Sequence, residues 1–238
     1  MKVDILAFAA HPDDVELACS GTLLKHHDLG YKIAIADLTR GELGTRGSAK
    51  MREQEANEAL KLMGFEAREN LELKDGFFTI DEPTLLKVIS VIRKYQPQIV
   101  FATAIQDRHP DHGRAAKLIA EAFFLSGLPK VETLLNGELQ NPWRPTALYH
   151  YIQDRLIKPD IVVDITGYLD KKLEVIRAYR SQFYNPDSNE PETSISKKDF
   201  LEFISARAKD FGRPIGAEYG EGFTAGRFVG VSDLFHLL

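Results

Sequence analysis

Two short clusters of histidine and aspartate stand out in this chain of 238 residues. They are His11-Pro12-Asp13-Asp14 and Asp107-Arg108-His109-Pro110-Asp111-His112. Imidazole and carboxylate groups are the ligands of catalytic zinc, which takes three protein ligands and keeps one position for water. His11, Asp14 and His112 could supply those three ligands. Asp13 could then lie beside the ion without binding it and act as a general base.

Each feature also has an ordinary structural explanation. A carboxylate at the start of a helix commonly caps that helix, and a single histidine in a loop is commonly only polar surface. Two such clusters, each directly after a predicted strand, are harder to explain in this way, so we interpret them together as a metal site. Two histidines and one carboxylate also suit ferrous iron, which leaves a non-haem iron oxygenase as an alternative. A metal-binding protein without catalytic activity is a second alternative.

The elements that must position these clusters follow from hydrophobic periodicity. Short apolar runs at 3–10, 31–38, 70–73 and 99–103 are expected strands, and the amphipathic segments 14–29, 51–63, 85–95 and 112–125 are expected helices. In the second half, 147–152 and 161–165 are expected strands, and 169–179 and 200–211 expected helices. The alternation predicts an α/β fold with a Rossmann-like, mostly parallel sheet flanked by helices on both faces. Ligands of such sheets lie beyond the carboxyl ends of the strands, where both clusters occur.

Composition excludes several classes of protein. The chain has 30 Lys and Arg against 35 Asp and Glu, a net charge of −5, which lacks the basic footprint of nucleic-acid binding. No apolar run reaches the roughly 18 residues of a membrane span. The single cysteine, Cys19, has no partner for an internal disulfide, which favours the reducing cytoplasm. We expect one cytoplasmic domain covering residues 1–238.

Several motifs resemble the zinc-dependent LmbE-like (PIG-L) N-deacetylases. The first signature of that family is similar to Ala10-His11-Pro12-Asp13-Asp14-Val15-Glu16, and the second to His109-Pro110-Asp111-His112. Further similar stretches are Asp37-Leu38-Thr39-Arg40-Gly41-Glu42-Leu43-Gly44, Arg52 with Glu55, Ser181-Gln182-Phe183 and Tyr219-Gly220-Glu221-Gly222-Phe223. Glycine replaces two alanines of the family in the last stretch. The resemblance therefore extends along almost the whole chain.

The resemblance implies a role for each site residue. His11, Asp14 and His112 would be the metal ligands, Asp13 the general base, and a protonated His109 the group that stabilises the oxyanion. Arg52 and Asp75 would contact sugar hydroxyls, and Arg108 an anionic aglycone. A neighbouring carboxylate such as Asp111 would keep His109 protonated, since a negative charge favours the imidazolium. Phe200 would occupy the position where some relatives carry a tyrosine over the site.

The resemblance also implies a substrate class. It is strongest to the deacetylases of bacillithiol synthesis, which act on N-acetylglucosaminyl-malate. Another small N-acetylglucosamine conjugate, or a chitooligosaccharide, is the alternative substrate. The implied cofactor is Zn²⁺, with Fe²⁺ possible in the cell, and the implied assembly is a homo-oligomer such as a hexamer. Gly41, Gly44 and Gly47 do not match a nucleotide-binding fingerprint, and we interpret them as part of a loop near the substrate.

Overall fold

The computed structural model describes residues 1–236 and contains a seven-stranded sheet of order β3-β2-β1-β4-β7-β9-β8. Its strands are β1 (Ile5–Ala9), β2 (Ile33–Thr39), β3 (Ala67–Leu73), β4 (Ile99–Ala102), β7 (Ala147–Tyr151), β8 (Ile161–Asp164) and β9 (Gly220–Ala225). The five strands from β3 to β7 in this order are parallel, and β9 is antiparallel to both of its neighbours. The expected mostly parallel α/β architecture is confirmed.

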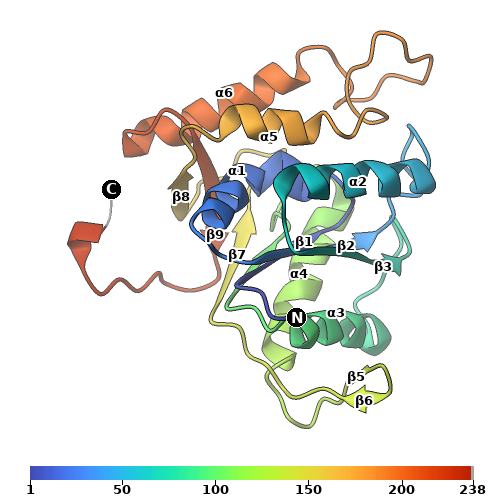
Figure 1. Ribbon diagram of the computed structural model, residues 1–238, viewed down its shortest axis with the longest axis vertical. Coiled ribbons are helices and arrows are strands. Elements are labelled where there is room, and N and C mark those ends of the chain that lie inside the picture. The colour runs from blue at the N-terminus through green and yellow to red at the C-terminus, as the bar shows by residue number, and fades with distance from the viewer. Residues whose placement is uncertain (237–238) are drawn as a thin grey trace.

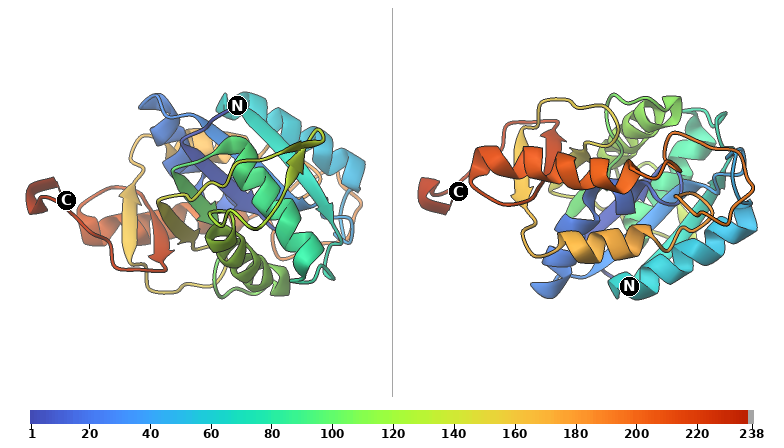
Figure 2. Two further views of the ribbon diagram at one scale, coloured as in Figure 1. Left: turned by 90° about the horizontal axis from the view of Figure 1, so that it is seen from below. Right: turned by 90° about the horizontal axis from the view of Figure 1, so that it is seen from above.

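Helices cover both faces of the sheet (Figures 1 and 2). One face carries α1 (Asp14–Asp28), α2 (Ala49–Met63), α5 (Leu169–Ile176) and α6 (Phe200–Gly212), and the other carries α3 (Glu82–Tyr95) and α4 (Pro110–Leu125). Successive residues of a strand point to opposite faces. Ile5 and Ala7 of β1 therefore pack into the first layer, while Leu6 and Phe8 pack into the second. This double burial explains the uninterrupted apolar sequence of β1.

The direction of strand order reverses at β1, which positions the site. The chain adds β2 and β3 on one side of β1 and then crosses to add β4 on the other side. Ligands of open α/β sheets bind at such a reversal, beyond the carboxyl ends of the two strands. The loop after β1 and the loop after β4 carry the two histidine and aspartate clusters, so the topology brings those clusters together.

The structure differs from the sequence-based expectation at several elements. Strand β9 was not expected, because two of its six residues are glycine, which disfavours strands. Helices α2, α3 and α4 begin two or three residues earlier than expected. Ser48 and Asp81 accept backbone N–H groups at the starts of α2 and α3, and polar first turns carry no apolar periodicity. A small hairpin of β5 (Leu134–Leu135) and β6 (Glu138–Leu139) was also not expected.

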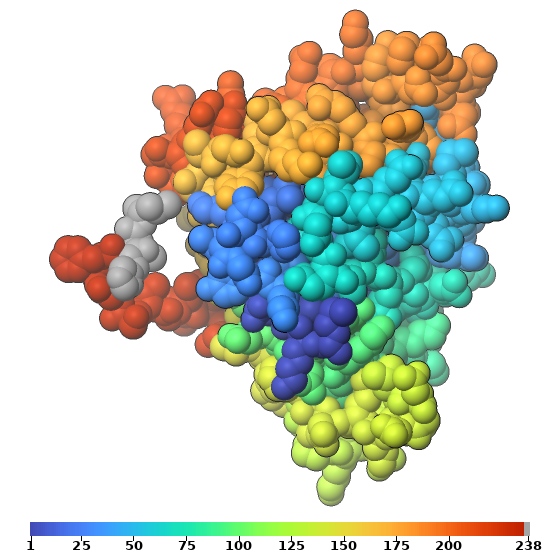
Figure 3. All heavy atoms as spheres, in the orientation of Figure 1, coloured from blue at the N-terminus to red at the C-terminus, as the bar shows by residue number. Residues whose placement is uncertain are grey.

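Two segments protrude from the body of the molecule (Figure 3). One is the β5–β6 hairpin, and the other is a carboxyl-terminal arm that follows β9. Short 3₁₀ helices are η1 (Arg213–Ile215), before β9, and η2 (Leu234–His236), within the arm. Phe228 and Phe235 on the arm are 99% and 96% exposed. Among the described helices, none has both the length and the apolar character needed to cross a bilayer.

Candidate active site

A cavity of about 380 Å³ lies beyond the carboxyl ends of β1 and β4. Eight of the nine residues expected at the site line it: His11, Asp13, Asp14, Arg52, Asp75, Arg108, His109 and His112. The ninth, Asp111, does not line the cavity, and its side chain is fully buried. Residues from four separate segments of the chain therefore converge on one space.

Asp14 joins the two histidines that were expected to bind metal. Its Oδ2 lies 3.5 Å from Nδ1 of His11, and its Oδ1 lies 3.2 Å from Nε2 of His112. Donors that share a tetrahedral zinc ion lie about 3.3 Å apart, given metal–ligand bonds of roughly 2.0–2.1 Å. All three side chains are nearly buried. The two contacts use different oxygens of Asp14, and the three side chains together supply imidazole and carboxylate donors of the kind that a divalent metal ion takes.

Two further carboxylates orient the His11 ring. Its Nε2 lies 3.1 Å from Oδ1 of Asp75 and 3.4 Å from Oδ2 of Asp111, which leaves Nδ1 facing Asp14. Burial raises the pKa of Asp75, but hydrogen bonds from His11 and from the Leu43 N–H outweigh it and hold that pKa at about 2. Asp75, expected to contact sugar, therefore also positions a candidate ligand. His11, Asp75 and Asp111 form a second group whose donor atoms lie within 4.8 Å of one another.

His112 is positioned by Asp107, whose role the sequence did not reveal. Asp107 Oδ2 lies 2.6 Å from Nδ1 of His112, and the same carboxylate accepts the N–H groups of Arg108 and Arg155. Burial opposes a charge on His112, but Asp14 and Asp107 outweigh it and raise the pKa of His112 to about 9. A carboxylate on the far nitrogen of a ligating histidine fixes its tautomer and increases its basicity. The only sequence signal was its place as the first of the two aspartates in the second cluster.

Asp13 occupies a strained position between β1 and α1. Its φ is 119°, in the left-handed region that non-glycine residues rarely adopt. Within residues 1–236 its carboxylate receives no hydrogen bond, although the residue is only 5% exposed. Burial raises the pKa of Asp13 to about 7, against the opposing charge of Arg52. Such strain persists at functional sites where the surrounding structure enforces it.

His109 corrects one expectation, because Asp111 does not pair with its ring. The Asp111 carboxylate instead contacts His11, lies 2.5 Å from Nη1 of Arg114 and accepts the Gly76 N–H. His109 precedes α4, and its Nδ1 accepts the backbone N–H of Asp111 at 3.3 Å. Burial and the neighbouring His11 and His112 lower the pKa of His109. Since Nδ1 accepts this hydrogen bond, Nε2 is the ring nitrogen that can donate toward the cavity.

Arg52 reaches the cavity from α2 through the glycine-rich loop. Its Nη2 donates to Oε1 of Gln182, and its buried Nε has no partner within residues 1–236. A Cβ added to Gly41 would lie 2.2 Å from Nη1 of Arg52, and one added to Gly44 would lie 2.9 Å from Nη2. The glycines are thus explained by close packing on a guanidinium. Arg46, by contrast, donates to the carbonyl oxygens of Ser181 and other loop residues, which makes it structural.

Arg108 and Gln153 complete the wall. The Arg108 side chain is 53% exposed at the rim, and its Nε donates to Oδ2 of Asp154 at 3.0 Å. Gln153 follows β7, and its Nε2 donates to Oδ1 of Asp14 at 2.7 Å. Sequence reasoning missed Gln153, because only the pairing of β7 with β4 brings it to the cluster.

Comparison with known proteins identifies the family. Residues 6–123, which include both clusters, match the PIG-L family, described as GlcNAc-PI de-N-acetylase. The crystal structure of the conserved protein TT1542 from Thermus thermophilus is 33% identical, with a TM-score of 0.85 over 97% of this chain and 98% of that chain. The chain belongs to the PIG-L/LmbE-like deacetylase family. This membership confirms the resemblance drawn from the motifs.

Two curated relatives of this PIG-L member carry more specific names. Diacetylchitobiose deacetylase of Thermococcus kodakarensis is 27% identical over 98% of this chain and 88% of its own. A probable N-acetyl-alpha-D-glucosaminyl L-malate deacetylase 2 of Bacillus anthracis is 25% identical over 75% of this chain and 81% of its own. Both names describe deacetylation of an N-acetylglucosamine compound.

Proposed function

We propose that the protein is a metal-dependent hydrolase that removes the N-acetyl group from an N-acetylglucosamine conjugate. The observation that carries the proposal is the convergence of His11, Asp14 and His112, with the Asp13 carboxylate uncommitted beside them. The names of the two curated relatives support the same substrate class.

Two imidazoles and one carboxylate suit Zn²⁺, and Fe²⁺ is the alternative in the cell. Such an ion, when bound, would polarise the acetyl carbonyl and lower the pKa of water from 15.7 to roughly 7. The remaining chemistry belongs to the side chains. Asp75 and Asp107 hold the two imidazoles in the orientation that ligation needs.

Asp13 and His109 divide the proton transfer and the charge stabilisation. Asp13 takes a proton from the attacking water as the new C–O bond forms, because its carboxylate is free to accept. His109 donates from Nε2 to the carbonyl oxygen as negative charge develops there. When the C–N bond breaks, Asp13 returns its proton to the sugar nitrogen. The products are a free amine and acetic acid, which releases its proton to water as acetate, and Asp13 ends in its starting state.

The cavity wall suits a sugar that carries an acid. Arg52 and Asp75 face the cavity, and each Asp75 carboxylate oxygen keeps a lone pair for a sugar hydroxyl. Arg108 stands at the rim, where its terminal nitrogens are suited to a carboxylate. We infer that the substrate is N-acetylglucosaminyl-malate, as in bacillithiol synthesis, with a chitooligosaccharide as the alternative. A cytoplasmic homo-oligomer, such as a hexamer, completes the proposal.

The test is acetate release by the zinc-loaded chain under nitrogen. We expect turnover without dioxygen, which an iron oxygenase could not support. The substrate panel is N-acetylglucosaminyl-malate, diacetylchitobiose and free N-acetylglucosamine. Asp13→Asn should lower kcat by at least about 10²-fold, the scale of general-base catalysis, whereas Asp210→Asn on the exposed surface of α6 should not. Arg108→Ala should raise KM for the malate conjugate alone. No acetate from any member of the panel would overturn the proposal.

Metal content tests the ligand assignment separately. Among the described residues, the donor atoms of His11, His109 and His112 lie within 4.8 Å of one another, whereas no such group contains Asp14, so His109 is a rival to Asp14 as third ligand. We expect His109→Ala to retain one metal ion per chain and to lose about 10²- to 10³-fold in kcat. Asp14→Ala should lose the ion. The reverse pattern would exchange the roles of these two residues.

A further inference from the structure

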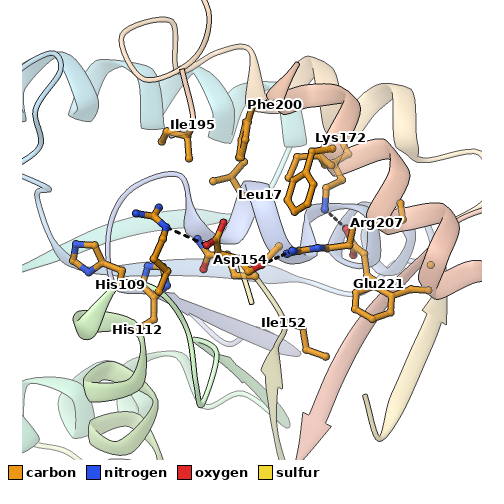
Figure 4. A pocket seen from close by; sticks show the side chains of 18 residues that line it. Leu17, His109, His112, Ile152, Asp154, Lys172, Ile195, Phe200, Arg207 and Glu221 are labelled. Atoms are coloured by element: carbon orange, nitrogen blue, oxygen red, sulfur yellow. Dashed lines mark hydrogen bonds and ion pairs between the residues drawn. The ribbon is translucent and has the colours of Figure 1, made fainter. Parts of the chain in front are cut away.

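A side cavity of about 50 Å³ extends from the active-site cavity between α1, α6 and β9 (Figure 4). Six residues line both cavities: Leu17, Arg108, His109, His112, Gln153 and Ile195. The side cavity therefore opens beside the histidines where the reacting carbonyl must lie. The proposed function leaves it without a role.

The wall of the side cavity is largely apolar. Its apolar lining includes Leu17 and Ile152 together with Phe200, Ile204 and Phe211 of α6. Phe200 stacks on Phe183, with ring centroids 5.8 Å apart, so its ring is held in the wall. An apolar group that enters this space would lose its contact with water at little cost to the protein.

The charged groups in the wall already have partners. Lys172 Nζ lies 2.5 Å from Oε1 of Glu221 at the end far from the histidines, and this buried pair closes the cavity there (Figure 4). Arg207 donates to the backbone oxygen of Asp154, and Arg108 donates to the Asp154 carboxylate. Within the described wall, the charged side chains far from the rim are therefore paired with one another or with the backbone, and only Arg108, at the rim shared with the active-site cavity, keeps terminal nitrogens for a ligand.

The two cavities match the two substituents of an amide carbonyl. Arg52 and Asp75, which suit a sugar, line only the active-site cavity. With the sugar nitrogen on that side and the carbonyl at His109, the alkyl part of the acyl group faces the side cavity. A volume of about 50 Å³ is one third of an apolar cavity that accepts benzene at roughly 150 Å³. It has room for a short alkyl chain and none for a second sugar ring.

We propose that the side cavity binds the alkyl part of the substrate's N-acyl group, and that the enzyme hydrolyses N-acyl groups longer than acetyl, up to about butyryl. This inference rests on the proposed N-deacylase function. Each methylene buried in an apolar site improves binding about fourfold. If the site instead ended at the acetyl methyl, one extra methylene on the acyl group would lower kcat/KM by 10-fold or more.

The experiment compares glucosamine substrates with N-acetyl, N-propionyl, N-butyryl and N-octanoyl groups, using the zinc-loaded chain and detecting the free amine. We expect kcat/KM to rise up to roughly 15-fold from acetyl to butyryl and to fall for octanoyl, which exceeds the cavity. Acetyl turnover with propionyl and butyryl at least 10-fold slower would overturn this inference and leave the proposed function intact. The inference would also be overturned if O-butyl glycosides of N-acetylglucosamine gave this rise in kcat/KM and N-butyryl substrates did not.

Variants locate the effect within the wall. Ala208→Leu adds bulk beside the cavity, and we expect it to lower the butyryl-to-acetyl ratio of kcat/KM at least fivefold. Because Ala208 is buried, Phe203→Ala provides a second test on a half-exposed residue of the same wall. It should move the optimum to a longer chain. Phe124→Ala, on the exposed surface of α4, is the matched control and should leave the chain-length profile unchanged. An unchanged profile in both wall variants would overturn the assignment.

A binding measurement works even where no substrate turns over. Butyrate and acetate are the acid products of two members of the series, and their dissociation constants are measured by calorimetry on the wild-type chain. We expect butyrate to bind roughly 15-fold more tightly, because two methylenes enter the side cavity. Equal affinities would overturn the inference. Absence of turnover on every N-acyl sugar, together with tighter butyrate binding, would overturn the proposed hydrolysis while supporting the alkyl site.

Discussion

At the scale of residues, the properties of the site come from the neighbours of each group. Asp13 and Asp14 are adjacent in sequence, but burial raises the pKa of Asp13 to about 7, whereas the histidine contacts of Asp14 outweigh burial and lower its pKa. Two carboxylates with such different environments suit different roles, one as a base and one as a ligand. The sequence indicates which groups are present, and their neighbours decide which group carries a proton.

The raised pKa of Asp13 predicts a pH-dependent cost to folding. In metal-free protein the folded state keeps a proton up to about pH 7, whereas the unfolded chain releases it near pH 3.8. Stability is therefore lost as pH rises through this window, and the loss is complete above it. Asp13→Asn removes that loss, so its melting temperature should exceed wild type by on the order of 5 °C at pH 8, with a smaller difference at pH 4.5.

The measurement is a thermal melt across pH 4–8.5 in chelator. Asn also tolerates the left-handed backbone better than most residues, but that benefit does not vary with pH. Asp210→Asn is the control. A difference between Asp13→Asn and wild type that stays constant across this range would contradict the buried, proton-holding carboxylate.

At the scale of elements, the spacing of apolar residues predicted the parallel strands and their helices, because each one buries a continuous apolar face. It did not predict β9, whose sequence Gly-Glu-Gly lacks the side chains that typify strands. The reason is close packing. A Cβ on Gly220 would lie 2.7 Å from Cγ1 of Val162 and 2.9 Å from the Gly212 nitrogen on α6. Glycine is needed there by a helix distant in sequence.

Gly220→Ala is therefore expected to destabilise the protein by roughly 1–3 kcal/mol through overpacking. The measurement is urea unfolding at a fixed metal concentration. Gly226→Ala is the matched control, because an added Cβ there would meet nothing within 4 Å. The control should stay within about 0.5 kcal/mol of wild type. Equal stability of the two variants would contradict the close approach of α6 to β9.

At the scale of the whole molecule, the carboxyl-terminal arm after β9 carries large exposed apolar side chains that a binding partner would cover. Phe228 and Phe235 expose almost their entire side chains, and Leu234 is 73% exposed. Several large exposed apolar side chains on one short segment indicate an interaction surface. They are consistent with the expected homo-oligomer, which stays a prediction.

We expect the double substitution Phe228→Ser with Phe235→Ser to shift the protein to a smaller assembly, as measured by light scattering after size-exclusion chromatography. The substitutions remove apolar area that association would bury. Leu29→Ser replaces an exposed apolar residue at the end of α1 and should leave the mass unchanged. A wild-type protein that is monomeric at micromolar concentration would contradict the prediction.

The sequence by itself determined the α/β class, the positions of the two clusters after their strands and the family. These features are local, because apolar periodicity and short motifs are complete within a few residues. Only the tertiary structure decided that Asp107 holds His112, that Gln153 reaches Asp14 and that Nδ1 of His109 accepts a backbone hydrogen bond. The side cavity likewise exists only in the tertiary structure, because its wall comes from α1, α6 and β9. Proton positions and cavities depend on which distant segments exclude water together, and one segment of sequence does not contain that information.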